Sequence, residues 1–163
     1  MTMTESTLRL EPLPALRLAG VSGEVGDTSE IKAMVAVLSE TLAARLATVG
    51  ASSAGRVCTF EGRPDGWRID VVVGVPLAPG DEPPAGLDVL NVPPAKRAAV
   101  AEQHRMGDEA IDPWLTIDTA LARCDLESYG PYRLVHLPNT DDGDDVVHLQ
   151  CPVRDAAPCH YGT

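Results

Sequence analysis

The chain has 163 residues, of which 44% are hydrophobic and 23% are charged, so it is typical of one globular domain and not of a disordered chain. It carries 13 Lys and Arg against 24 Asp and Glu, a formal net charge of -11, and no basic cluster. Nucleic acids and anionic membrane surfaces are bound chiefly through cationic side chains. We therefore expect neither a nucleic acid nor a membrane as a partner.

No apolar run approaches the ~18–20 residues that a membrane span needs. Residues 1–7 lack the basic and apolar regions of a signal peptide, and we expect a cytoplasmic protein. The four cysteines show no CxxC spacing, so we expect no metal site and no structural disulfide. The motifs of the common enzyme classes, GxSxG, HExxH and phosphate-binding glycine loops, are absent, and we expect no cofactor.

The chain predicts the order strand, helix, strand, strand, and it predicts that order twice. β-rich runs are separated by Gly/Pro turns in each half, which is typical of hairpins. The expected strand regions are residues 8–24, 56–60 and 67–76 in the first half, and residues 87–106, 132–137 and 146–153 in the second.

Two helices are expected between these strands. In the first, apolar residues recur every three or four positions from Ile31 to Val49. Thr28 or Ser29 is its expected N-cap, and Gly50 is expected to end it.

The second helix is expected to run from Ile111 to Leu126, with Asp108 as its cap. Pro113 fits only in its first turn, where a missing N–H costs nothing. Trp114 falls on its apolar stripe, and core packing is the favoured interpretation for that side chain.

The repeated order of elements predicts an internal duplication, because similarity between two segments of one chain is the sequence signature of a repeat. Pro14-Ala15 aligns with Pro94-Ala95, and residues 71–77 align with residues 147–153. We expect a single domain over residues 7–154, made of two repeats. The repeats are residues 7–78 and 87–154, the linker is residues 79–86, and residues 1–6 and 155–163 are expected to be flexible tails.

These units predict an α+β fold in which two βαββ repeats form one curved antiparallel sheet with both helices on one face. The strands at residues 71–75 and 146–151 are apolar on both faces. A solvent-exposed sheet face would alternate between apolar and polar residues. We therefore expect the second face to be an apolar ligand groove at the junction of the repeats.

The duplicated unit ends each time in an apolar run plus proline: Val73-Gly74-Val75-Pro76-Leu77 and Leu149-Gln150-Cys151-Pro152-Val153. This pattern resembles the gyrase-inhibitor-like (GyrI-like) small-molecule-binding superfamily, and residues 13–20 resemble its first strand. The resemblance covers residues 7–154. It implies an effector-binding domain of the kind found in multidrug-responsive transcription regulators, in stand-alone binding proteins, and in a branch that hydrolyses cyclopropane-bearing toxins. No helix-turn-helix segment precedes the domain, so we expect the stand-alone form.

One departure from the superfamily concerns the ligand. Its members commonly carry a groove-facing glutamate four residues before the final proline, where the carboxylate meets cationic ligands. The matching residues here are His148 and Val72. A neutral histidine does not favour a cation as a buried carboxylate does. The resemblance therefore does not carry cation binding over to this chain.

Groove-facing strand residues are the candidate ligand contacts. His148 and His136 become cross-strand neighbours in one register of the last hairpin; otherwise one is solvated and one packed. Gln150 shares the face of His148, because strand residues alternate with a period of two. Gly74 takes the matching place in the first half. The full ligand-binding set is His148, Gln150, His136, Val72, Gly74, Phe60, Trp67, Tyr132 and Cys58.

The leading functional hypothesis is a stand-alone protein that sequesters or senses a hydrophobic small molecule, such as a drug or a natural product. The alternative is an enzyme on the same scaffold that hydrolyses a reactive lipophilic toxin, with His148, His136 and Glu102 as acid–base groups. A third hypothesis is a module that docks a protein through a sheet edge or its acidic surface. A homodimer is left open.

Overall fold

The computed structural model describes residues 8–51, 55–62, 68–104, 113–137 and 146–156. It confirms the α+β class and the single large antiparallel sheet that the sequence predicts. The helices are α1 (Ile31–Ala47) and α2 (Pro113–Arg123). The strands are β1 (Leu8–Leu13), β2 (Leu16–Val25), β3 (Val57–Gly62), β4 (Ile69–Pro76), β5 (Asp88–Val92), β6 (Ala95–His104), β7 (Leu126–Ser128), β8 (Tyr132–Leu137) and β9 (Val146–Asp155).

A long two-stranded ribbon organises the sheet. β1 pairs with β6, and β2 pairs with β5, in almost one continuous antiparallel register from Leu8↔Ala101 to Gly20↔Asp88. Prolines interrupt both strands at the same level, Pro14 between β1 and β2, and Pro93-Pro94 between β5 and β6. Proline lacks the N–H that a central ladder needs, so the ribbon bends where they lie.

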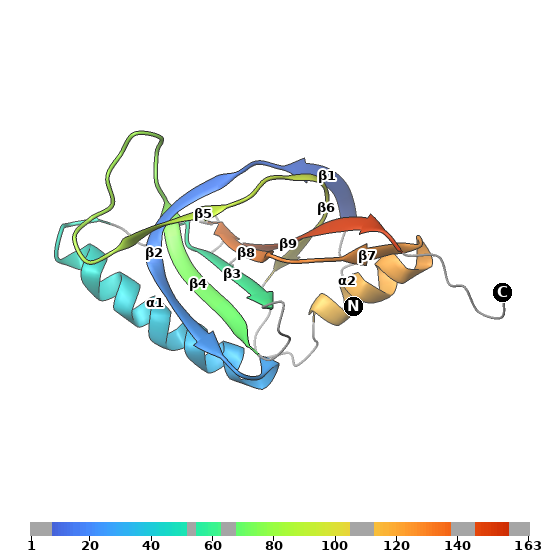
Figure 1. Cartoon of the computed structure of the whole chain (residues 1–163), viewed down its shortest axis with the longest axis horizontal. Helices are drawn as coiled ribbons and strands as arrows, with labels where there is room; N and C mark the ends of the chain where they lie inside the picture. Colours follow the sequence, from blue (N-terminus) through green and yellow to red (C-terminus); the bar gives the residue numbers. More distant parts are fainter. Residues whose placement is uncertain (1–7, 52–54, 63–67, 105–112, 138–145, 157–163) are drawn as a thin grey trace.

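The remaining strands connect the two ends of this ribbon. The sheet order is β1-β6-β9-β8-β3-β4-β2-β5, with the β3·β8 pair at its centre and β7 attached to β9. Because β1 continues into β2 and β5 into β6, both ends of that path lie in the same ribbon, and the sheet curves back on itself. Figure 1 shows the ribbon arching over the side of the molecule opposite the helices.

Both helices cover the same face of the sheet. Leu38, Leu42 and Leu46 of α1 pack against a cluster that contains Val71 and Val73. The α2 residues in the second cluster pack against buried residues of β6 and β9, and Leu134 of β8 contacts both clusters. Burying each such aliphatic side chain contributes roughly 1.5–3 kcal/mol, so these clusters hold the helices on the sheet.

Apolar side chains also fill much of the face without helices, which we call the helix-free face. Leu18, Val57 and Val92 form a buried cluster there, with Leu16, Val72, Leu90 and Val135 packed against it. A second small cluster contains Leu13, Ala95, Ala98 and Val100. The bent ribbon supplies most of these residues. It explains why residues 71–75 are apolar on both faces: α1 covers one face and the ribbon covers the other.

Two predicted element boundaries are wrong. Thr28 and Ser29 do not cap α1, because both lie in a 3₁₀ turn, Thr28–Glu30, that leads into the helix. Glu30 is the N-cap and makes no side-chain cap hydrogen bond; its carboxylate accepts one from the Gly26 N–H at 2.9 Å instead. Leu126, expected in the second helix, belongs to β7, because α2 ends at Arg123.

Other predicted boundaries agree with the structure. Pro113 is the first residue of α2, and Gly50, in a left-handed conformation (φ 73°), follows the end of α1. Asp108 and Ile111 lie outside the described residues. No helix in the described part of the chain is long and apolar enough to cross a bilayer.

β2 and β4 approach each other closely at a pair of glycines. Gly20 and Gly74 are directly opposed in the antiparallel register. A Cβ on Gly20 would lie 2.3 Å from the Val73 carbonyl oxygen, and a Cβ on Gly74 would lie 2.9 Å from the Ala19 carbonyl oxygen. Backbone atoms cannot move aside as side-chain ends do, so the close approach of β2 and β4 requires glycine at both positions.

We expect Gly20→Ala to lower the free energy of unfolding by roughly 1–3 kcal/mol, because the added methyl group overpacks the backbone of β4. Urea denaturation measures the change. Gly62→Ala is the matched control, since a Cβ there has nothing within 4 Å. Equal stabilities of the two variants would contradict the proposed close approach.

Cys58 is fully buried beneath α1. Burial raises the pKa of its thiol to about 11 from an ordinary 9.0, although the nearby Arg56 partly offsets the increase. The unfolded chain releases the thiol proton near pH 9, whereas the folded chain keeps it until about pH 11. Cys58 thus adds stability that is fully present below pH 9 and is lost as the pH rises toward 11.

The stability difference between the wild type and Cys58→Ala should therefore shrink as the pH rises from 8 to 11, by up to roughly 2 kcal/mol. Urea denaturation at several pH values in this range tests this expectation. Val73→Ala provides the control, because it removes a buried side chain of the same cluster that cannot ionise, and its stability difference should not depend on pH. A constant difference for Cys58→Ala would show that the folded thiol ionises as readily as the unfolded one.

Candidate functional site

A cavity of about 320 Å³ remains on the helix-free face, at the margin of the apolar cluster around Val57. One side of it comes from the central strands β3, β8 and β9, and the other from the bend that joins β1 to β2. Gly55 and Pro76 also contribute. The lining residues are Glu11, Pro12, Leu13, Pro14, Leu16, Gly55, Val57, Pro76, Arg133, Val135, His136 and Gln150.

The bend that lines this cavity follows from the sequence. The register between β1 and β6 shifts between Glu11 and Leu13, which places Pro12 at a bulge. Bulges and edges are where proline is tolerated in a sheet. Pro14 then ends β1 and turns the chain into β2. Both prolines border the cavity, so the residues that bend the ribbon also form its wall.

Arg133 is the buried charged residue of this site. Its side chain is 1% exposed, and it lies on β8 opposite Gln150 of β9. Nη2 donates a hydrogen bond to the Pro93 carbonyl oxygen at 2.7 Å, which connects β8 to the bend in the ribbon. Nε is buried and has no hydrogen-bond partner among the described residues. Burial lowers the pKa of the guanidinium, but an arginine stays charged at any physiological pH.

Two further polar groups line the cavity with Arg133. Gln150 is its direct cross-strand neighbour. Glu11 lies across the cavity on β1, where its Oε1 accepts a hydrogen bond from Nε of Arg9 at 3.0 Å. Both side chains of that ion pair are more than 40% exposed, so solvent screens it.

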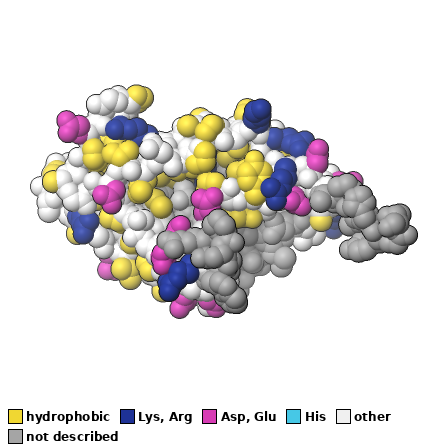
Figure 2. Space-filling model, viewed as in Figure 1, with side chains coloured by type: hydrophobic (Ala, Val, Ile, Leu, Met, Phe, Trp, Pro, Cys, Tyr) yellow, Lys and Arg dark blue, Asp and Glu magenta, His cyan; other side chains and the backbone are white. Residues whose placement is uncertain are grey.

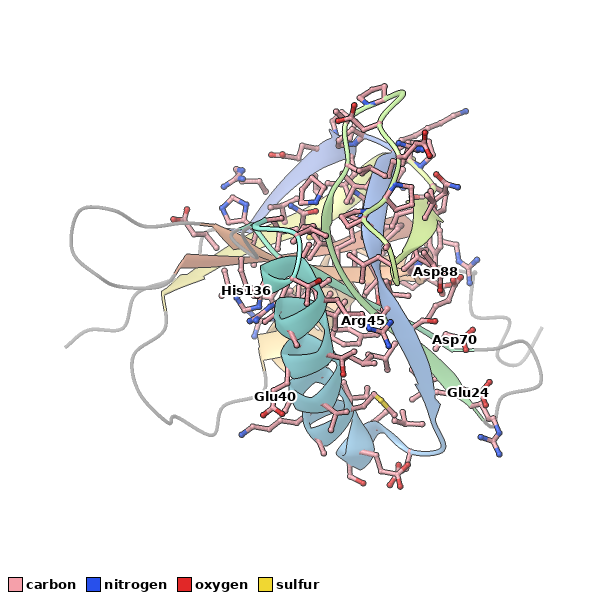
Figure 3. All side chains as sticks on the ribbon, turned by 90° about the vertical axis from the view of Figure 1, so that its left-hand side faces the viewer. Glu24, Glu40, Arg45, Asp70, Asp88 and His136 are labelled. Carbon is pink, nitrogen blue, oxygen red and sulfur yellow. The ribbon has the colours of Figure 1, made fainter. Side chains whose placement is uncertain are left out.

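His136 also borders the cavity, near the start of β3. Its backbone N–H donates to the Arg56 carbonyl oxygen at 2.9 Å, and its Nε2 lies 3.4 Å from Nη2 of Arg56. Figure 3 shows His136 on the opposite side of α1 from Asp70 and Glu24, which are neighbours in the β2·β4 register. These two carboxylates are therefore remote from His136.

The two histidines are not cross-strand neighbours. The register pairs His148 with Val135 and His136 with Val147. Successive strand residues alternate between faces, so His148 shares the helix-free face with Gln150 while His136 takes the register position of the other face. His148 is paired instead with Glu102 of β6. Neither His148 nor Glu102 lines the cavity.

The remaining predicted contacts are divided between the two faces. Cys58 and Phe60 pack with the α1 cluster, and Tyr132 packs with the α2 cluster. Because these clusters lie under the helices, the three side chains point away from the helix-free face. Val72 belongs to the apolar cluster of that face but lies outside the cavity lining. Gly74 is outside the lining too, and Trp67 lies outside the described residues.

Arg133, Glu11 and the proline bend were not predicted as parts of the site. A signal for Arg133 exists: it is the one charged residue in the run Tyr132-Arg133-Leu134-Val135, and the alternation that assigns Leu134 to the helices assigns Arg133 to the other face. The sequence around the bend does not show that it lines the cavity, because that depends on which strands the ribbon crosses in the folded chain.

Within the described part of the chain, no three His, Cys, Asp or Glu residues are grouped so that they could hold a metal ion. Figure 2 shows hydrophobic side chains gathered over the upper middle of the visible face, with charged side chains of both signs scattered around them.

Comparison with known proteins gave matches among solved structures only. No protein-family model and no curated protein matches the sequence. The structure of SAV2435 bound to tetraphenylphosphonium matches with a TM-score of 0.63 at 15% identity, over 93% of this chain and 94% of that one. The C-terminal domain of EcmrR matches with a TM-score of 0.60 at 10% identity, over 94% and 100%.

A third match is the integron cassette protein VCH_CASS2 of Vibrio cholerae, with a TM-score of 0.64 at 14% identity over 90% of this chain and 95% of that one. Each match spans nearly the whole of both chains, while the identities are low. The chain therefore has the same fold as these three proteins, and the resemblance stated from the sequence agrees with the matches at the level of the fold.

Proposed function

We propose that this protein binds an organic small molecule in the cavity between the proline bend and strands β3, β8 and β9, and thereby sequesters or senses it. The observation that carries the proposal is the cavity itself. The helix-free face is otherwise filled by its own apolar side chains, yet about 320 Å³ stays open where polar groups converge. Ligand pockets in proteins typically have ~300–1,000 Å³ and an apolar lining with a few polar groups.

The structural matches support this proposal. SAV2435 has the same fold and its structure holds tetraphenylphosphonium, so the fold accommodates a bulky apolar ligand in that protein. The match to the C-terminal domain of EcmrR covers the whole of that domain and nearly all of this chain, so the likeness extends over both sides of the cavity.

We also infer that the domain arose from two tandem repeats. The pairing of β2 with β4 has its counterpart in the pairing of β6 with β9, and the β3·β4 hairpin has its counterpart in the β8·β9 hairpin. The bends at Pro14 and at Pro93-Pro94 are counterparts as well. In this interpretation the cavity lies where the two repeats meet, across the central β3·β8 pair.

We expect hits from a library of lipophilic natural products and drugs to raise the melting temperature, because a ligand that binds only the folded state stabilises it. Val135→Phe should abolish these shifts, since the larger ring occupies the cavity. Val72→Phe is the matched control: it lies on the same face but outside the lining, and it should keep the shifts. The absence of any shift with the wild-type protein would contradict the proposal.

An enzyme on this scaffold is the second candidate function. The observation in its favour is the pairing of Glu102 with His148 on adjacent strands β6 and β9, because a carboxylate beside an imidazole is a common acid–base arrangement. Both residues lie outside the cavity lining, which favours binding over catalysis.

The two functions differ in the fate of the ligand. With a tenfold molar excess of any hit over protein, a binding protein returns all of it unchanged in mass spectrometry. An enzyme converts more than one equivalent, and Glu102→Gln should then slow conversion by roughly 100-fold or more, as the loss of a general acid–base does. Complete recovery of every hit would remove the enzymatic alternative.

A further inference from the structure

Arg133 has no ionic partner in the described part of the chain. Its guanidinium donates one hydrogen bond, to the Pro93 carbonyl oxygen, and none of the described carboxylates lies within 4 Å of it. Arginine carries five N–H donors and cannot release its proton in a protein. A buried charge normally has a partner, because an unpaired one has lost its hydration without compensation.

A purely structural role does not account for this charge. Connecting β8 to the Pro93 carbonyl oxygen needs one neutral donor, and the neighbouring positions on this face are apolar or an amide, Val135 and Gln150. Removing the charge would remove the desolvation cost and keep the packing. A positive charge at this position is instead explained if an anion from outside the chain binds to it.

The other charges near the cavity leave Arg133 uncompensated. Glu11, the only carboxylate among the described lining residues, is already paired with Arg9 at 3.0 Å. His136, also in the lining, lies beside a second cation, Arg56. The formal net charge of -11 repels anions at long range. At physiological salt, however, charges farther away than the Debye length of ~8 Å are screened, so the buried guanidinium decides the local preference.

From these contacts we propose that the cavity selects an organic anion: an apolar body that carries a carboxylate or a similar planar oxyanion bound by Arg133. This inference rests on the proposed function and adds the ligand class to it. The guanidinium is a planar fork that matches such groups, and the amide of Gln150 on the adjacent strand is a second donor. The preference is opposite in sign to that of SAV2435, whose structure holds a phosphonium cation.

A matched ligand series tests the sign of the charge. Isothermal titration of the wild-type protein with 2-naphthoate, 2-naphthamide and 2-naphthylmethylammonium presents one ring system with negative, zero and positive charge. We expect 2-naphthoate to bind most tightly and the ammonium most weakly. If the amide or the ammonium binds as tightly as the acid, the inference is overturned while the proposed function stands.

Variants of Arg133 test whether that residue carries the preference. Arg133→Met should lower the affinity for 2-naphthoate by about 10–100-fold, the loss expected for a charge-assisted hydrogen bond. It should leave the affinity for 2-naphthamide nearly unchanged. The affinity of Arg133→Lys for 2-naphthoate should lie between those of the wild type and Arg133→Met, because lysine keeps the positive charge but lacks the planar guanidinium. Arg68→Met is the control, since Arg68 is exposed and pairs with Glu24 far from the cavity.

The remaining outcomes separate the two claims. If Arg68→Met weakens the binding of 2-naphthoate as strongly as Arg133→Met does, the binding is not specific to Arg133. If Val135→Phe binds 2-naphthoate as well as the wild type does, the ligand occupies a different site. Either result would overturn the inference. If Arg133→Met does not fold, the wild-type series and Arg133→Lys still decide. If none of the three probes binds and the library gives no thermal shift, the proposed function fails as well.

Discussion

The bend in the β1–β2/β5–β6 ribbon is the constraint on which the rest of the structure depends. An open sheet with helices on one face would expose its other face to water. Here both ends of the sheet path lie in one ribbon, and prolines bend the two strands of that ribbon at the same level. The sheet therefore curves until its second face is covered by its own edge, and apolar residues from the ribbon and the central strands fill the enclosed space.

In this curved sheet β2 and β4 lie so close together at one level that only glycine fits there. Gly20 and Gly74 oppose each other in the β2·β4 register, and neither position has room for a methyl group. Inside the curved sheet, part of the enclosed space is not filled by side chains. The cavity lies there, and the residues that bend the ribbon, Pro12 and Pro14, form part of its lining. Fold and site thus share one cause.

The proposed chemistry of the cavity depends on Arg133, the buried cation among the described residues that line it. Low exposure strengthens every electrostatic interaction of Arg133, and it also makes an unpaired charge costly. A bound oxyanion would convert that cost into affinity, because the guanidinium is already desolvated and held by the Pro93 carbonyl oxygen. Under this proposal, two proteins of one fold bind ligands of opposite charge, because a strand residue such as Arg133 sets the preferred sign in this chain.

Local patterns in the sequence predicted much of the fold. The run from Ile31 has a helical period, the runs at residues 132–137 and 146–153 are β-rich between turns, and residues 71–75 are apolar on both faces. Helix boundaries were less accurate where competing local hydrogen bonds decide them. Glu30 is the N-cap and accepts a hydrogen bond from the Gly26 N–H, while Thr28 and Ser29 lie in the 3₁₀ turn before the helix.

The sequence by itself determined the α+β class, the order of most elements and the resemblance to the GyrI-like superfamily, because each depends on residues close together in the chain. It also predicted an apolar groove along the second face, whereas the bent ribbon and its own side chains fill much of that face. Only the tertiary structure decided the register of the last hairpin, which separates His136 from His148 and pairs His148 with Glu102. It alone also brought Arg133, Gln150 and the proline bend around one cavity. These contacts join strands far apart in the chain, and a register shift of one residue exchanges the faces of a strand, so periodicity within one segment cannot fix them.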